Sequence, residues 1–124
     1  MQTILFVGIG GFVGAIVRFL LSSLVQKSAE TFFPIGTLSV NLLGGFLIGI
    51  LALYFEQHLN PEYRALVIVG FLGGLTTFST FSYETVLLLE NASYTKALLN
   101  IMINVVFSIG ATILGMMVYK KFFI

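Results

Sequence analysis

The sequence contains no cysteine, and only 9% of its 124 residues are charged. Without cysteine, neither disulfide bonds nor thiol chemistry is available to the protein. A soluble domain normally has about a quarter of its residues charged, because polar groups must cover its water-facing surface. With 58% hydrophobic residues and a mean hydropathy of +1.06, this chain cannot cover such a surface. The composition therefore predicts a protein whose surroundings are lipid.

Charged residues are absent from the intervals 31–55, 65–83 and 97–119, and residues 4–25 contain only one, Arg18. Each interval holds roughly the 20 residues that a helix needs to cross the hydrocarbon core of a membrane. We therefore predict an all-α integral membrane protein, with residues 1–124 forming a single domain. Its four predicted transmembrane helices are Ile4–Val25, Ile35–Phe55, Ala65–Leu89 and Ala97–Tyr119.

The basic residues do not determine how the chain is oriented in the membrane. One side would hold Arg64, Lys120 and Lys121, and the other would hold Lys27, Lys96 and Arg18. An equal count gives no positive-inside bias. The chain could insert both ways and form an antiparallel pair, or one orientation could dominate through weaker cues. The sequence shows no basic cluster that would indicate a nucleic-acid partner.

Small residues recur at a spacing of four in three of the predicted spans. The pairs are Gly10 with Gly14, Gly45 with Gly49, and Ala111 with Gly115. This spacing lets helix backbones approach closely in a membrane. The contacts could lie between two protomers or within one, and the spacing alone does not decide between them.

Two spans carry amide side chains inside the membrane, where an amide without hydrogen-bond partners is unfavourable. Asn41 lies in the second span and needs hydrogen-bond partners, either from another helix or in a wet cavity. The fourth span carries a polar residue at every fourth position: Asn100, Asn104, Ser108 and Thr112. This spacing places all of them on one helix face. The face could be one wall of a hydrophilic track or a set of interhelical bonds, and we favour the track.

The third span contains Gly70-Phe-Leu-Gly-Gly-Leu-Thr-Thr-Phe-Ser-Thr-Phe-Ser-Tyr-Glu84, in which glycines precede a run of serines and threonines. This composition predicts a break in the helix, and a membrane tolerates one only where the freed backbone groups find partners. Phe78 and Phe81 share a face, so their electropositive ring edges could meet an anion, or they could simply pack. Arg18 could snorkel to the interface or supply a fixed positive charge at an anion vestibule.

Three motifs together resemble the bacterial fluoride channels of the Fluc/CrcB family: residues 11–18, residues 36–44 and the 70–84 motif. The resemblance extends over the whole chain. It implies a fluoride-selective channel that passively exports fluoride across the bacterial cytoplasmic (inner) membrane. It also implies an antiparallel, dual-topology homodimer with two pores, surrounded by lipid.

The resemblance also implies roles for individual residues. The pore and anion-binding residues would be Arg18, Asn41, Phe78, Ser79, Thr80, Phe81, Asn104, Ser108 and Thr112. A structural sodium ion, which is not transported, would be held by the backbone carbonyl groups of Gly73 and Thr76. Each protomer would supply two of these carbonyls at the dimer centre.

Two other functions fit the sequence less well. A small dual-topology multidrug transporter also has four short spans, but it needs a carboxylate within the first span, and residues 4–25 contain none. An intramembrane enzyme would need a histidine or acidic group inside a span. His58 lies in a polar loop, and only Glu84 lies close to a span. We therefore expect no enzymatic activity.

We predict that the chain inserts in both orientations, because its basic residues are balanced. C-terminal fusions to two reporters, one active only in the cytoplasm and the other only outside it, should both be active. Adding a few lysines to one side should then force a single orientation. Dual insertion is excluded if the natural chain activates only one of the two reporters.

Overall fold

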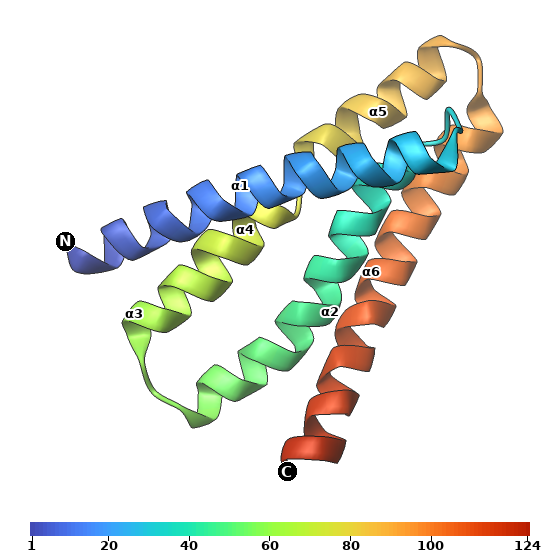
Figure 1. Cartoon of the computed structure of the whole chain (residues 1–124). Helices are drawn as coiled ribbons and strands as arrows, with labels where there is room; N and C mark the ends of the chain where they lie inside the picture. The colour runs from blue at the N-terminus through green and yellow to red at the C-terminus, as the bar shows by residue number, and fades with distance from the viewer.

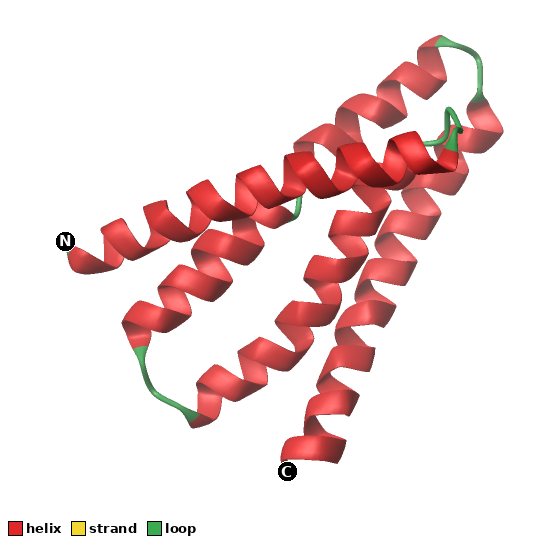
Figure 2. Ribbon diagram, viewed as in Figure 1, coloured by secondary structure: helices red, strands yellow, loops and turns green.

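A computed structural model describes all residues from Met1 to Ile124, and its regular structure is entirely helical (Figure 2). Three helices are continuous: α1 (Gln2–Ala29), α2 (Ile35–Gln57) and α6 (Tyr94–Phe123). Between α2 and α6, the segment Pro61–Glu90 consists of several shorter helices. All four long elements are apolar enough to cross a membrane, which confirms the prediction of a four-span membrane protein.

The four spans pack as two pairs (Figure 1). Helix α1 lies along the first half of the third span, and α2 lies beside α6. Short connections join the spans, and Asn60 helps to start the third by accepting a hydrogen bond from the backbone N–H of Tyr63 at 3.1 Å. Pro61 follows in the first turn, where its missing N–H leaves no hydrogen bond unmade. Helices α1 and α6 extend a few residues beyond their predicted ends.

Glycines allow the helices of each pair to touch through their backbones. An added Cβ atom at Gly10 would overlap the carbonyl oxygen of Leu66, and one at Gly14 would overlap that of Phe71. In the other pair, a Cβ atom at Gly45 would lie 2.9 Å from the carbonyl oxygen of Ser108. These glycines therefore make close contacts within one chain, which is one of the two alternatives that the sequence left open.

The third span begins with α3 (Pro61–Arg64), continues as the π-helix η1 (Ala65–Leu72), and reaches α4 (Gly73–Leu75). The backbone then becomes extended at Thr76, with φ −88° and ψ 157°, before α5 (Ser79–Glu90) begins. The break predicted from the sequence is present, and it divides the predicted span 65–89 into shorter helices.

The glycines of this span do not form the break themselves. No glycine has a positive φ, and Gly73 has the ordinary helical values of φ −62° and ψ −36°. Gly74 instead lets α4 approach α1, because an added Cβ atom there would lie 2.8 Å from the carbonyl oxygen of Gly11. The sequence reasoning was right about the break, but the helix ends at the threonines that follow the glycines.

We predict that Gly49→Ala destabilises the protein while Gly110→Ala does not. A Cβ atom at Gly49 would overlap the carbonyl oxygen of Thr112 and lie 2.9 Å from the backbone nitrogen of Met116. Gly110, also helical, has no atom within 4 Å of such a Cβ. Overpacking costs about 1–3 kcal/mol, whereas alanine at an open helical position is favourable by about 0.5–1 kcal/mol. Thermal unfolding in detergent measures both effects, and equal behaviour of the two variants would contradict the packing described.

Candidate functional site

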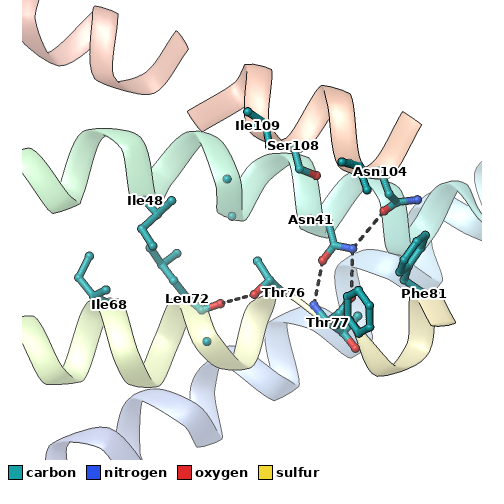
Figure 3. Close-up of a pocket in the computed structure, with 15 residues that line it drawn as sticks. Asn41, Ile48, Ile68, Leu72, Thr76, Thr77, Phe81, Asn104, Ser108 and Ile109 are labelled. Atoms are coloured by element: carbon teal, nitrogen blue, oxygen red, sulfur yellow. Dashed lines mark hydrogen bonds between the residues drawn. The ribbon is translucent and has the colours of Figure 1, made fainter. Parts of the chain in front are cut away.

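A cavity of about 500 Å³ lies beside the break in the third span, and its walls come from α2, the third span and α6 (Figure 3). Its polar lining includes Asn41, Thr77, Asn104 and Ser108, set among apolar side chains such as Ile48. No charged side chain lines it. The cavity therefore offers neutral polar groups in largely apolar surroundings.

Asn41 connects α2 to the broken backbone. The N–H of Thr77 donates to its Oδ1 at 2.8 Å, and its Nδ2 donates back to the carbonyl oxygen of Thr77 at 3.1 Å. The same Nδ2 also donates to Oδ1 of Asn104 at 3.2 Å (Figure 3). Asn41 is thus both an interhelical clasp and part of the cavity wall, the two roles that the sequence set against each other.

The break leaves two carbonyl groups without their usual helical donors. The N–H of Thr77, which would bond the Gly73 carbonyl in a continuous helix, donates to Asn41 instead. The N–H of Thr80, which would bond the Thr76 carbonyl, donates to the hydroxyl oxygen of Thr77 at 3.1 Å. Gly73 and Thr76 both line the cavity, so carbonyl-bearing backbone lies along its wall.

The two predicted phenylalanines lie together at the cavity. The rings of Phe78 and Phe81 are 5.4 Å apart between centroids and inclined at 61°. Phe81 is buried, whereas 77% of Phe78 is exposed on the isolated chain. Aromatic ring edges carry partial positive charge, so the pair adds a weak electropositive surface to the site.

The polar face of α6 is mostly engaged in hydrogen bonds inside the chain. Asn104 donates from Nδ2 to both the carbonyl oxygen and Oδ1 of Asn100, each at 2.9 Å. The hydroxyl of Thr112 is 2.9 Å from the carbonyl oxygen of Gly45 and lies outside the cavity. Ser108 alone has a hydroxyl that lines the cavity without a hydrogen bond from the chain. Most of this face therefore holds helices together, and Ser108 supplies a free donor.

The remaining predicted residues lie apart from this cavity. Arg18 and Thr80 line a second cavity of about 260 Å³, together with Thr37 and Thr77. Ser79 is exposed, and its hydroxyl lies 3.3 Å from that of Thr77. The structure thus separates one cavity with only uncharged lining residues from a smaller one that contains the arginine.

Sequence reasoning gave no site role to three further polar residues, of which only Thr37 lines one of these two cavities. Glu84 has one carboxyl oxygen that is buried without a hydrogen-bond partner, although its position suggested only an interface marker. Thr37 is buried and lines the second cavity. Thr85 is buried on α5 and accepts a hydrogen bond from Asn100 at 2.9 Å. The position of Glu84 at the end of the 70–84 motif was the sequence feature that could have identified it.

Comparison with known proteins shows similarity along nearly the whole chain. The family model for CrcB-like protein, Camphor Resistance (CrcB), matches residues 5–116. A relative from Sulfurovum sp. is 56% identical over 120 residues, covering 97% of this chain and 95% of that protein. One from Nitratiruptor sp. is 52% identical over 117 residues, covering 94% and 91%. One from Shewanella pealeana is 45% identical over 124 residues, covering 98% and 100%. Each of these relatives is named "Fluoride-specific ion channel FluC".

Proposed function

The chain belongs to the CrcB-like protein family, and on this premise we propose that it is a fluoride-selective channel of the bacterial inner membrane. Fluoride would leave the cytoplasm passively through it, which would lower the cytoplasmic concentration. The observation that carries the proposal is identity of 52% and 56% to proteins named as fluoride channels, over nearly the full length of the chain. Four apolar spans provide the membrane setting that such a channel needs.

The cavity beside the break has a chemistry that suits a small anion. Fluoride is strongly hydrated, so a pore must replace its water with other donors, yet hold it weakly enough for release. Ser108 offers a free hydroxyl, and the rings of Phe78 and Phe81 add ring edges. A cationic side chain in the cavity wall would bind the anion too tightly, and the lining contains none.

The Asn41 side chain can donate a hydrogen bond to an anion only by giving up one of its two present acceptors. Of its two donor contacts, the one to Asn104 is the longer, at 3.2 Å, and both residues line the cavity. An anion in the cavity would accept this N–H in place of the Asn104 oxygen. The bond to the Thr77 carbonyl, at 3.1 Å, would keep the break in place during the exchange.

We further propose that two copies assemble as an antiparallel dimer. The balanced basic residues permit both orientations in the membrane. One chain leaves Phe78 largely exposed beside the cavity, where a partner would cover it. A twofold axis along this face would place the same residues of both copies against each other. Lipid would surround the outward apolar side chains of the pair.

Reconstitution in liposomes tests the proposed function directly. We expect fluoride efflux, followed with an ion-selective electrode, from vesicles that contain the wild-type protein. Asn41→Asp should abolish efflux, because its carboxylate would face the oxygens of Thr77 and Asn104 and repel the anion. Two unit charges 4 Å apart repel by roughly 4 kcal/mol at an effective dielectric constant of 20, which slows transfer on the order of a thousandfold.

Asn60→Asp is the matched control, because aspartate caps a helix as well as asparagine does and Asn60 lies in an exposed loop. Phe78→Ile and Phe81→Ile should also reduce fluoride flux sharply while leaving the size of the assembly in detergent unchanged. Wild-type flux from Asn41→Asp and from both phenylalanine variants would overturn the assignment of the pore to this cavity.

The backbone at the break also supports a proposed structural sodium site. The carbonyl oxygens of Gly73 and Thr76 have lost their helical donors to Asn41 and Thr77, and both residues line the cavity. Carbonyl oxygens that hydrocarbon cannot satisfy are suitable ligands for a hard cation. In the antiparallel dimer, two such oxygens from each copy would surround one ion on the axis. The ion would be part of the scaffold and would not be transported.

Prolonged removal of sodium should therefore inactivate the channel slowly, and restoring sodium should recover fluoride efflux. Gly73→Ala adds a test at the site itself. The nearest atom to an added Cβ atom in the chain would be the carbonyl oxygen of Ile68 at 4.0 Å, so each protomer should accept the methyl group. If this methyl group crowds the ion site in the dimer, the variant should need a higher sodium concentration for activity. Full activity after verified sodium depletion would exclude the sodium proposal and leave the channel proposal standing.

A further inference from the structure

A continuous series of hydrogen bonds joins the two ends of segment 77–81, which carries both phenylalanine rings. We call this series the amide ladder. It passes in order through Thr77, Asn41, Asn104, Asn100, Thr85 and the carbonyl oxygen of Phe81. The successive donor–acceptor distances are 2.8, 3.2, 2.9, 2.9 and 2.8 Å. The ladder leaves the third span, crosses α2 and α6, and returns to the third span on α5.

Every member of the ladder donates in the same direction. The backbone N–H of Thr77 is the first donor, each asparagine accepts through Oδ1 and donates through Nδ2, and the hydroxyl of Thr85 donates to the Phe81 carbonyl. Hydrogen bonds arranged head to tail polarise one another, and a low-dielectric interior strengthens each of them. The ladder is therefore stiffer than the same bonds would be if they were isolated.

The far part of the ladder lies away from the cavity. Asn100 and Thr85 are 1% and 7% exposed, and neither lines the cavity that holds the phenylalanine rings. They cannot contact an ion there, so any influence on permeation must pass through Asn104 or Phe81. Because both are buried, removing the Thr85 hydroxyl would leave the Asn100 amide N–H unpaired in surroundings that offer no water.

We propose that Asn100 and Thr85 are positioning residues, which fix segment 77–81 and so set the orientation of the Phe78 and Phe81 rings toward the permeating anion. Asn41 holds the beginning of this segment, and Asn100 on α6 holds its end through Thr85, which lies one turn after Phe81 on α5. Between these points the segment carries both rings of the site. The part of the proposal that concerns the anion rests on the proposed fluoride channel.

The direct test is Thr85→Val, which preserves the shape of the side chain and removes its hydroxyl. Thr85→Ser keeps the hydroxyl and should rescue the effect, and Thr95→Val makes the same change at an exposed residue of α6. Asn100→Leu interrupts the ladder at the adjacent position. Liposomes with at most one channel each give two measurements, the fraction of vesicles that release fluoride and the efflux rate within those vesicles.

We expect Thr85→Val and Asn100→Leu to slow efflux within active vesicles by roughly tenfold and to lower the preference for fluoride over chloride. A factor of ten corresponds to about 1.4 kcal/mol, which is in the range for one buried donor left unpaired. Thr85→Ser and Thr95→Val should behave as the wild type does. A role confined to folding would lower the fraction of active vesicles and leave the rate and the anion preference of the remaining channels unchanged, and that outcome would overturn the proposal.

A second measurement does not depend on channel activity. With 4-fluorophenylalanine in place of Phe81, the fluorine resonance of the ring should shift in Thr85→Val and stay unchanged in Thr85→Ser and Thr95→Val. An unchanged resonance in Thr85→Val would refute the positioning role. Absence of fluoride efflux from the wild type would refute the proposed function instead, and the fluorine measurement would still decide the role of the ladder.

Discussion

The bond pair between the Asn41 side chain and the backbone of Thr77 is the interaction on which the site depends. Hydrocarbon provides no partner for a backbone group that a broken helix leaves unpaired, so another part of the protein must provide one. The Asn41 amide accepts from the Thr77 N–H and donates to the Thr77 carbonyl, as a neighbouring strand would. By holding this peptide outside the helix, it keeps the Gly73 carbonyl free of its usual donor. The break and the free carbonyl therefore depend on one side chain, and its bond pair also holds the beginning of the segment that carries the phenylalanines.

Close helix packing determines where that side chain can act. Asn41 reaches Thr77 because α2 and the third span are held together, and an added Cβ atom at Gly44 would overlap the side chain of Thr76. The small residues of α1 and α6 similarly allow contacts between backbones within each pair of helices. In a membrane these contacts are an important source of association, because lipid tails are as apolar as the side chains and provide little hydrophobic driving force. The glycines thus act by letting neighbouring helices approach closely, and none of them adopts a positive φ.

Much of the fold could be predicted from the sequence, because charge-free intervals of membrane-crossing length have few other interpretations. The polar groups of the site could be identified, but their partners could not. A spacing of four shows that Asn100, Asn104, Ser108 and Thr112 share one helix face, but it does not show which helix they meet. The structure shows that Asn104 and Thr112 bond within the chain and that the Ser108 hydroxyl does not. The role of the glycines near the break was also hidden, because glycine is typical both of irregular backbone and of close helix contacts.

Neutral amides can pair with freed backbone groups inside the membrane without placing a buried charge there. A buried charge would need a partner or would hold an anion permanently, whereas an amide both donates and accepts and can exchange one partner for another at moderate cost. Asn41 has a firm bond pair to the backbone and a longer bond to Asn104, so the two demands of stability and exchange fall on different contacts of one side chain. Asn104 is in turn held by Asn100 through two bonds of 2.9 Å, which would keep it in place during the proposed exchange of partners by Asn41. An amide chain of this kind can support a break in the membrane interior and still present an exchangeable donor to a passing ion.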